Sequence, residues 1–599
     1  MKLLFIILSA VLAASAQDVN VTPSPDSSHV AFTRGGDLWL RNTASGKELR
    51  VTDDASDDIS SGYASWVYYE EIFGRQSKFK AFWWSPDGRK LAFYRFDNSG
   101  IGTFPIFSPF GQYGSLNNTR YPKAGGPNPK VRLAFTDLEG NVVWADFKDD
   151  PQQYFGTPFW GDDSRSLYVQ WMPRRQNHLE LFKVDSVDGS KASVYEENYP
   201  TWVGWMDEML FGKDGLYMVR SFETGWEQIY YLSYDGKTLK RLTEGTNRST
   251  HLLKLDEKKG DIWFISNRDS PLHPTLYRLD KKGGVTALTN PEYWTNEVKF
   301  SPDGKTFTAN CSNARTPWHK VEGSSFKGVA SAVDGPQQTD EGPSPQIVMI
   351  ENGVFALYGL ISYPKGFDAG SGLKYPVVMM LYGGPGTAYV RDFWQNRDAS
   401  DRWCWENGII YIVVDPRSSG ENGRKGLDEA FGRMTVIELD DYLAWAKWLK
   451  GLGYVSKIGV EGFSFGGTTT TMLTLRYPEY FSCGIAGGGV YDWRLYDTHY
   501  TERYMDTPAA NPEGYRIASP LNFVKGSKIA PGALKLTHGT GDDNVHFQNT
   551  LQLVDALQKE GIQFELMIYP DGMHGYRGLQ HEHDKAADHI FWTRHLLGK

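Results

Sequence analysis

The chain has 599 residues, too many for one hydrophobic core, so at least two domains are expected. With 40% hydrophobic and 23% charged residues it has a globular composition, and 14% aromatic residues favour many short strands packed on large rings. The net charge of −9 argues against a nucleic-acid binder, which would carry a basic surface.

The first residues have the three parts of a secretory signal peptide. Lys2 is the positive start, Leu3 to Ala13 form the apolar run, and Ala14-Ser15-Ala16 form a cleavage site of small residues. The apolar run is too short to span a bilayer, and no later stretch of the sequence reads as a transmembrane helix. We therefore expect residues 1–16 to be removed, the mature protein to be exported to the periplasm or the extracellular space, and no stable membrane anchor.

A turn followed by a short apolar strand recurs through the first half of the chain. Proline presets this turn and Asp-Gly closes it in the clearest copies, such as SPDGRKLAF. Six copies, spaced about 45 to 75 residues apart, are typical of propeller blades, whereas an ordinary β-sandwich is the alternative. They begin at Ser24, Ser85, Gly161, Gly212, Glu257 and Ser301. We expect an all-β propeller over residues 17–345.

The segment WVYYEEIFGR lies between the first and the second blade signature and contains the adjacent residues Glu70 and Glu71. Taken alone, two adjacent glutamates read as a solvated helix surface.

From residue 346 onward, continuous apolar strands alternate with helical segments, such as the helix expected over Val436 to Lys450. This alternation predicts a mostly parallel α/β sheet. We place the boundary at residue 345, in the Pro- and Gly-rich stretch DGPQQTDEGPSP. The fold class expected is an N-terminal all-β propeller plus a C-terminal α/β-hydrolase domain over residues 346–599.

The segment GFSFG is a G-x-S-x-G nucleophile elbow, with a strand before it and a helix after it. It predicts Ser464 as the nucleophile, which needs a base, and α/β-hydrolases supply Asp and then His after later strands. Asp542 and His574 follow the strands ALKLTHGTG and FELMIYPDGM. Competing candidates near them are Asp543, His538, His546, His581 and His583.

Acyl transfer also needs donors for the developing oxyanion. The backbone N–H of Phe465 is one natural donor, and the loop LYGGPG offers the Tyr382 hydroxyl as a second. Simple packing of the Tyr382 ring is the alternative interpretation. The three cysteines have neither disulfide-framework nor metal-site spacing, and we expect no cofactor and no metal.

Four segments together carry a family resemblance: WVYYEE, GFSFGG, YDTHYTERYM and HGTGDDNVHFQ. The chain resembles the dipeptidyl peptidase IV group of the prolyl oligopeptidase family of serine peptidases over nearly all of its mature length. The resemblance implies a β-propeller with an α/β-hydrolase, the triad Ser464, Asp542 and His574, and Tyr382 with the Phe465 amide as oxyanion donors.

The resemblance also implies residues that bind the substrate. The apolar pocket for the residue before the cut bond would be lined by Val490, Trp493, Tyr496, Tyr500 and Val545. A rigid aromatic slot suits proline, which has apolar area and no N–H to satisfy. Arg503 and Asn544 would hydrogen-bond a substrate carbonyl. Glu70 and Glu71 would pair with the free α-ammonium, so that only a bond two residues from the N-terminus reaches the nucleophile.

The chain departs from the family in two places. Phe463 and Phe465 flank the serine where the family often has Trp and Tyr, and both changes keep an aromatic ring. The family has more blades than the six signatures found here, and it has an early arginine on the substrate carbonyl that finds no match. We expect a propeller shortened at its front.

The leading hypothesis is a secreted serine exopeptidase that releases Xaa-Pro or Xaa-Ala dipeptides through an acyl-enzyme. Two alternatives remain: a prolyl tripeptidyl aminopeptidase of the same family, and a catalytically defective propeller binding protein. The expected partners are peptides with a free N-terminus and, because relatives dimerise through the hydrolase domain, a second copy of the chain.

Overall fold

The structure is a computed structural model that describes residues 17–335, 342–395 and 400–599. The predicted signal peptide lies outside the described residues. The chain divides into two compact units. The first unit runs to Ile101 and also contains Asn128–Val169 and Phe182–Ala192, and the second contains Gly102–Pro127, Gln170–Leu181 and Ser193–Lys599.

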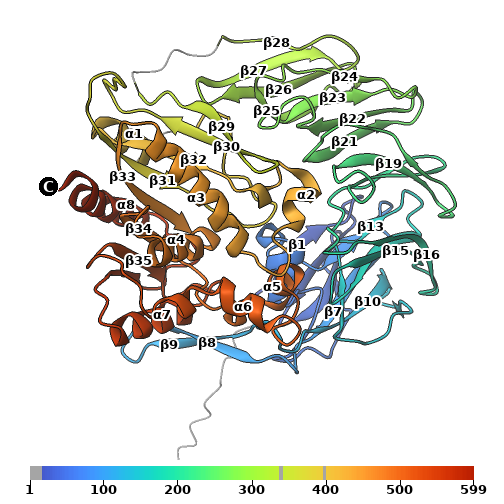
Figure 1. Cartoon of the computed structure of the whole chain (residues 1–599). Helices are drawn as coiled ribbons and strands as arrows, with labels where there is room; N and C mark the ends of the chain where they lie inside the picture. The colour runs from blue at the N-terminus through green and yellow to red at the C-terminus, as the bar shows by residue number, and fades with distance from the viewer. Residues whose placement is uncertain (1–16, 336–341, 396–399) are drawn as a thin grey trace, which may run out of the picture. The chain divides into compact units, whose positions relative to one another are not determined.

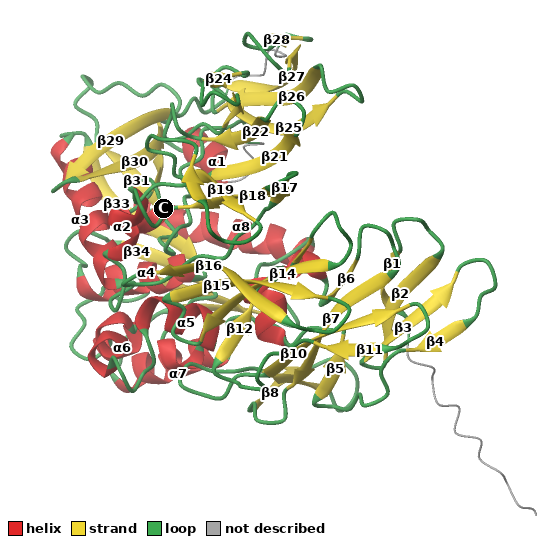
Figure 2. Ribbon diagram, turned by 90° about the vertical axis from the view of Figure 1, so that its right-hand side faces the viewer, coloured by secondary structure: helices red, strands yellow, loops and turns green. Residues whose placement is uncertain are grey.

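Six small sheets of four or five strands follow one another in the described part of the chain before residue 333 (Figure 2). The first three contain β1 (Val19–Pro23), β2 (His29–Arg34), β3 (Asp37–Asn42) and β4 (Glu48–Arg50); β5 (Ile59–Ser61), β6 (Phe82–Trp84), β7 (Lys90–Asp97), β10 (Lys130–Asp137) and β11 (Val142–Trp144); and β12 (Gln153–Phe155), β13 (Phe159–Trp160), β14 (Ser166–Pro173), β15 (His178–Asp185) and β16 (Lys191–Asn198).

The next three sheets belong to the second unit and repeat a four-stranded pattern in chain order. They contain β17 (Leu210–Phe211), β18 (Gly215–Arg220), β19 (Gln228–Ser233) and β20 (Leu239–Arg241); β21 (Thr250–Asp256), β22 (Asp261–Ser266), β23 (Thr275–Leu279) and β24 (Val285–Ala287); and β25 (Trp294–Phe300), β26 (Thr306–Asn313), β27 (Thr316–Ser324) and β28 (Ser331–Ala332). A separate hairpin joins β8 (Thr103–Ser108) to β9 (Ser115–Arg120).

Each blade signature leads into an inner strand of a different sheet: β2, β7, β14, β18, β22 and β26. The second copy shows why the motif forms a turn. The Ser85 hydroxyl donates to the Asp87 carboxylate at 2.7 Å, and Gly88 takes the left-handed backbone at φ +71° that favours glycine. The buried strand β7 begins directly after this turn.

The rest of the second unit is built on an eight-stranded sheet in the order β29-β30-β32-β31-β33-β34-β35-β36. The two pairings made by β30 are antiparallel, and all pairings from β32 onward are parallel. The strands are β29 (Gln346–Asn352), β30 (Phe355–Ser362), β31 (Tyr375–Met380), β32 (Ile410–Val414), β33 (Val455–Phe463), β34 (Cys483–Gly487), β35 (Leu534–Gly539) and β36 (Glu565–Tyr569).

Helices flank this sheet (Figure 1), as the sequence alternation predicts. They are α1 (Ser400–Glu406), α2 (Gly423–Asp428), α3 (Val436–Gly451), α4 (Phe465–Arg476), α5 (Thr498–Met505), α6 (Pro512–Ala518), α7 (Gln548–Lys559) and α8 (Leu579–Trp592). Shorter helical turns are η1 (Tyr68–Ile72), η2 (Arg75–Ser77), η3 (Arg417–Ser419), η4 (Trp493–Leu495), η5 (Pro520–Phe523) and η6 (Thr593–Leu597). Among the described helices, none is both long and apolar enough to cross a membrane.

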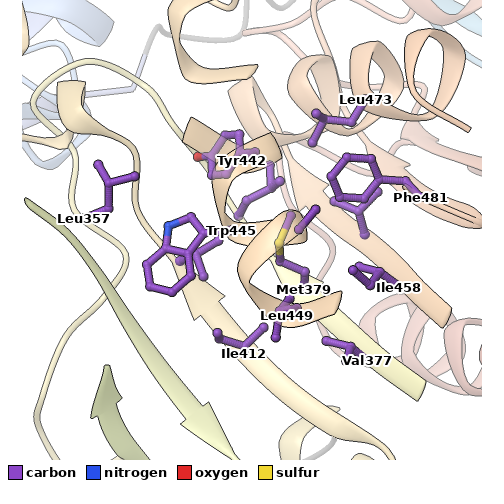
Figure 3. Close-up of a cluster of buried hydrophobic side chains, with 14 of the residues drawn as sticks. Leu357, Val377, Met379, Ile412, Tyr442, Trp445, Leu449, Ile458, Leu473 and Phe481 are labelled. Carbon is purple, nitrogen blue, oxygen red and sulfur yellow. The ribbon is translucent and has the colours of Figure 1, made fainter. Parts of the chain in front are cut away.

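The core of the eight-stranded sheet forms where α3 packs on the central strands (Figure 3). Tyr442, Trp445 and Leu449 recur at helical spacing and are fully buried, and they share one cluster with Met379 of β31 and Ile412 of β32. This packing fixes the central strands, and β33 among them ends at the candidate nucleophile.

Candidate active site

The turn between β33 and α4 presents Ser464 in a backbone conformation that a serine rarely adopts, with φ +60° and ψ −121°. Glycines make the turn possible. A Cβ on Gly462 would lie 2.6 Å from the Gly466 backbone, and a Cβ on Gly466 would lie 2.6 Å from the Leu381 carbonyl oxygen. The sharp turn therefore holds the Ser464 hydroxyl at the end of the sheet, as a nucleophile elbow does.

Ser464, His574 and Asp542 form a continuous chain of hydrogen bonds. The His574 Nε2 atom lies 2.9 Å from Ser464 Oγ, and the His574 Nδ1 atom lies 2.7 Å from Asp542 Oδ2. Asp542 follows β35 and His574 follows β36, so both loops leave the same edge of the parallel sheet. In this arrangement the imidazole can take the serine proton while the carboxylate holds its Nδ1–H.

The Asp542 carboxylate is buried, yet it is held in its charged form. Its Oδ1 atom accepts the backbone N–H groups of Asn544 at 3.0 Å and Val545 at 2.9 Å. Burial raises the pKa of Asp542, but the charges and hydrogen bonds of His574 and His538 outweigh burial and hold that pKa well below its usual range. Asp542 is thus suited to stabilise an imidazolium.

His538, a competing candidate base, contacts the carboxylate rather than the serine. Its Nε2 atom lies 3.3 Å from Asp542 Oδ2 and 2.8 Å from the Val545 carbonyl, and its Nδ1 atom lies 2.7 Å from Thr550 Oγ1. Since Nε2 faces two acceptors, it carries the ring proton and donates to the nearer Val545 carbonyl, with the Asp542 carboxylate beside it. Sequence spacing marks this histidine but cannot tell a base from a supporting donor.

The two expected oxyanion donors belong to neighbouring residues, one of them in the elbow itself. Phe465 is the first residue of α4, so its N–H group is one of the unsatisfied donors at a helix N-terminus. The Tyr382 ring stacks on Tyr389 with centroids 4.7 Å apart and lies 6.0 Å from the Phe465 ring. A Cβ on Gly384 would lie 2.6 Å from that Tyr382 ring, which explains the small residue in LYGGPG.

A buried carboxyl group, Glu438 on α3, lies beneath the same loop and was not marked by the sequence. Its side chain accepts the Ser418 hydroxyl at 2.7 Å, and a Cβ on Gly383 would lie 3.5 Å from its Cγ. Burial raises the pKa of Glu438 to about 7, and nearby Asp441 adds to the rise. The folded protein therefore holds a proton here that the unfolded chain releases near pH 4.5.

We expect this proton to make stability depend on pH. Because the folded pKa lies above the unfolded value, the stabilisation is complete below pH 4.5 and is lost as pH rises through 7, by about 3 kcal/mol in total. Denaturant midpoints at pH 5 and pH 8 test this, with Glu438→Gln as the comparison. The midpoint of Glu438→Gln should fall less between the two pH values than that of the wild type; an equal fall in both would contradict the assignment.

The apolar pocket residues expected from the family meet in one cluster of the second unit. Val490, Trp493, Tyr496 and Val545 are buried there, and Tyr500 packs against them. The Tyr500 ring lies 5.6 Å from Tyr496 and stacks toward Trp493 at 6.5 Å. These rings pack in one cluster with Phe465 of the elbow, and their role as a slot for proline stays a prediction.

Arg503 and Asn544, the two expected carbonyl-binding residues, are both oriented by neighbours. The Arg503 Nε–H group donates to Gln176 Oε1 at 2.8 Å, and Tyr496 donates its hydroxyl to Asn544 Oδ1 at 2.8 Å. With Oδ1 bound to Tyr496, the amide Nδ2 is the end of Asn544 that can donate to a carbonyl. Sequence reasoning missed Gln176, because no local signal links it to a residue more than three hundred positions later.

Glu70 and Glu71 belong to the first unit, whereas the triad belongs to the second. They sit in η1, a single π-helical turn, a feature often found at functional sites. The Tyr68 ring anchors this turn: it is buried, and its hydroxyl accepts the Phe155 N–H at 3.1 Å. Glu70 forms an ion pair with Arg75. The role of the two glutamates as a ruler stays a prediction.

Two family profiles match the sequence. Residues 9–318 match the profile described as "Dipeptidyl peptidase IV (DPP IV) N-terminal region", and residues 396–599 match the "Prolyl oligopeptidase family" profile. They confirm the predicted fold class, in which a propeller-like region of many antiparallel sheets precedes an α/β-hydrolase domain.

Curated relatives match across most of the chain. A probable dipeptidyl peptidase 4 of Neosartorya fischeri is 30% identical over 92% of this chain and 76% of its own length. A protein of the same description from Emericella nidulans is 28% identical, with 75% of its length covered. A probable dipeptidyl-aminopeptidase B of Aspergillus niger is 31% identical, and the chain spans 65% of its length.

Solved structures agree with these matches. The crystal structure of Porphyromonas gingivalis dipeptidyl peptidase 4 superposes with a TM-score of 0.88 at 27% identity, covering 97% of this chain and 83% of that chain. A putative dipeptidyl aminopeptidase IV from Bacteroides ovatus gives a TM-score of 0.86 at 26% identity, with coverages of 97% and 84%. The family resemblance that the sequence predicts is thus confirmed by the similarity of the whole fold.

Proposed function

Because the chain belongs to the dipeptidyl peptidase IV group of the prolyl oligopeptidase family of serine peptidases, we propose that it removes Xaa-Pro or Xaa-Ala dipeptides from free peptide N-termini. The observation that carries this proposal is the hydrogen-bonded series from Ser464 through His574 to Asp542. Next to that series, and within the same unit, lies the aromatic cluster that contains Trp493 and Tyr496, in which we place the proline slot.

In the proposed mechanism, Ser464 Oγ attacks the carbonyl carbon of the second residue as His574 Nε2 takes the hydroxyl proton. The tetrahedral oxyanion receives hydrogen bonds from the Phe465 amide and the Tyr382 hydroxyl. His574 then gives its proton to the leaving amine, and an acyl-enzyme remains on Ser464. A water molecule, deprotonated by His574, hydrolyses this ester and releases the dipeptide.

Substrate selection follows from the pocket and the carbonyl-binding residues. A proline ring fills the slot with apolar area and requires no hydrogen bond, and alanine fits with less burial. Arg503 and Asn544 would bind the carbonyl of the first residue, since each is already oriented by Gln176 or Tyr496. The early arginine of the family has no assigned counterpart here.

Hydrolysis of a Gly-Pro chromogenic amide tests the proposal, and mass spectrometry of a longer peptide gives the length of the product. Release of a dipeptide is expected, release of a tripeptide would favour the tripeptidyl alternative, and turnover no higher than that of Ser464→Ala would contradict peptidase activity. A fluorophosphonate, which reacts only with an activated serine, should label the wild type. Lack of labelling would favour the binding-protein alternative.

Replacing both ruler glutamates should remove the preference for a free N-terminus. We expect Glu70→Gln/Glu71→Gln to lower kcat/KM for a free Xaa-Pro peptide by about 100-fold or more, because two charge-assisted hydrogen bonds are lost. The N-acetylated peptide should be cleaved no more slowly than by the wild type. Glu139→Gln, an exposed glutamate of the same unit, is the control. Equal preference in variant and wild type would remove the ruler.

The domain assignment, export and assembly complete the proposal. We assign residues 1–16 to a signal peptide, 17–345 to the propeller and 346–599 to the hydrolase, with export after cleavage near Ala16. A homodimer is supported by apolar side chains exposed on the second unit, among them Phe107, Phe110, Leu116 and Leu551. The mass of the protein in solution by light scattering tests this; a monomer at micromolar concentration would contradict it.

A further inference from the structure

The hairpin β8–β9 and the segment that follows it, residues 103–126, contact three separate parts of the candidate active site. We call these residues the arm, and they lie in the same unit as the triad. We propose that the arm is a positioning element for catalysis, which holds the Asp542 loop, the His574 loop and the proline pocket in register. This inference rests on the proposed function for its catalytic consequence, and on the contacts below for its structure.

The first contact fixes the loop that carries the acid. Tyr121 is buried, and its hydroxyl donates to the Asn544 carbonyl oxygen at 2.9 Å. The N–H group of Asn544 in turn donates to Asp542 Oδ1 at 3.0 Å. One phenol therefore fixes the residue that both orients the catalytic carboxylate and presents the carbonyl-binding amide.

Aromatic stacking on His546, two residues after Asn544, also holds the loop that carries Asp542. The Phe104 ring stacks on the imidazole of His546 with centroids 3.6 Å apart at 12°, and the Tyr121 ring lies 4.4 Å from it. His546 is fully buried, and neither ring nitrogen has a hydrogen-bond partner within the described chain. Burial lowers the pKa of His546 to about 3, and the charge of Lys123 lowers it further. The His546 ring is therefore uncharged near neutral pH and provides a flat surface on which Phe104 stacks.

The arm also reaches the start of the helix behind the loop. Lys123 Nζ donates to Gln548 Oε1 at 2.6 Å, and β8 lines a groove of about 710 Å³ together with α7 and Asp542. Figure 1 shows β8 and β9 running beside α7. The acid loop is thus held between its own sheet and the arm.

The second contact is with the loop that carries the base. The Ser108 hydroxyl, at the end of β8, donates to Asp571 Oδ2 at 2.6 Å. Asp571 lies three residues before His574 and takes a left-handed backbone at φ +53°, and its N–H group donates to Thr540 Oγ1 at 2.9 Å. Ser108 therefore holds the turn that positions the His574 imidazole.

The third contact is with the pocket. The N–H of Ala124 donates to the Tyr496 carbonyl at 2.9 Å, and the N–H of Thr498 donates to the Pro122 carbonyl at 3.0 Å. The N–H of Gly125 donates to Glu502 Oε1 at 2.7 Å. The arm thereby adds a short antiparallel pairing to the segment whose rings line the slot.

The three contacts have a common consequence. The acid loop, the base loop and the pocket are separated in sequence, and the arm contacts all three of them in addition to the contacts that they make with one another. A displacement of about 1 Å in a catalytic group can cost on the order of 100-fold in rate. Loss of a single bond from the arm should therefore slow the chemical step while the protein stays folded.

Tyr121→Phe removes the hydroxyl and keeps the ring, so it tests positioning rather than packing. Tyr113→Phe is the matched control, since it deletes a hydroxyl on the same arm where the side chain is 89% exposed. We expect Tyr121→Phe to lower kcat for a Gly-Pro amide by about tenfold, as the loss of one buried hydrogen bond implies. Labelling by a fluorophosphonate, which needs no peptide pocket, should slow by a similar factor.

Amide hydrogen exchange gives a measurement that does not depend on activity. We expect the Asn544 and Val545 amides to exchange about fivefold to tenfold faster in Tyr121→Phe than in the wild type, and unchanged in Tyr113→Phe. Unchanged exchange in both variants would overturn the inference. Faster exchange in Tyr121→Phe, combined with a wild type that the fluorophosphonate fails to label, would instead contradict the proposed function and leave the arm as the element that holds this loop.

Discussion

Ser464→Ala should abolish turnover of a Gly-Pro amide, with kcat falling by about 10⁶-fold, the scale seen when the nucleophile of a serine triad is removed. The physical reason is that the His574 Nε2 atom lies 2.9 Å from Ser464 Oγ, so this hydroxyl is the group that the imidazole deprotonates. Without that oxygen the imidazole has no nucleophile to deprotonate, and only binding and the oxyanion donors remain to assist water.

The comparison separates lost chemistry from lost structure. Alanine has the same backbone freedom as serine at φ +60°, so the elbow and the unfolding midpoint should be unchanged. Fluorophosphonate labelling should vanish in Ser464→Ala and persist in Ser482→Ala, a serine immediately before β34. Residual turnover above about one part in 10³ of the wild type would contradict Ser464 as the nucleophile.

Asp542→Asn should lower kcat by about 10⁴-fold with little change in fold, because it switches the His574 imidazole to its other tautomer. The Asp542 Oδ1 position accepts two backbone N–H groups, from Asn544 and Val545, so the amide oxygen of an asparagine must take that side. Its NH₂ group then faces His574 Nδ1. Two donors cannot share a hydrogen bond, so the ring adopts the other tautomer and Nε2 can no longer accept the serine proton.

Steady-state kinetics of Asp542→Asn beside Asp543→Asn measures this effect. Asp543 is the neighbouring carboxylate that sequence spacing could not set aside; it is half-buried and lies outside the hydrogen-bonded series from Ser464 to Asp542, so its amide should keep kcat within about twofold of the wild type. Equal losses in the two variants would mean that the assignment of the acid is wrong. A rise in KM with an unchanged kcat in Asp542→Asn would point to substrate binding instead.

Much of the architecture could be predicted from local patterns. The recurring turns before short apolar strands placed one motif in each of six sheets, because turn chemistry depends on neighbours within a few residues. The helix expected over Val436 to Lys450 forms as Val436–Gly451, since its apolar positions recur at helical spacing. The glycines of GFSFGG predicted the elbow, because only glycine tolerates the close backbone approach there.

The sequence by itself therefore determined the two-part fold, the nucleophile elbow and a short set of candidate acids and bases, all of which are encoded within a few residues. Only the tertiary structure decided that His574, rather than His538, lies on the serine, and that Gln176 orients Arg503. It alone brought the arm to the loops of Asp542 and His574. Those contacts join residues hundreds of positions apart, and their geometry depends on how whole elements pack, which no local propensity records.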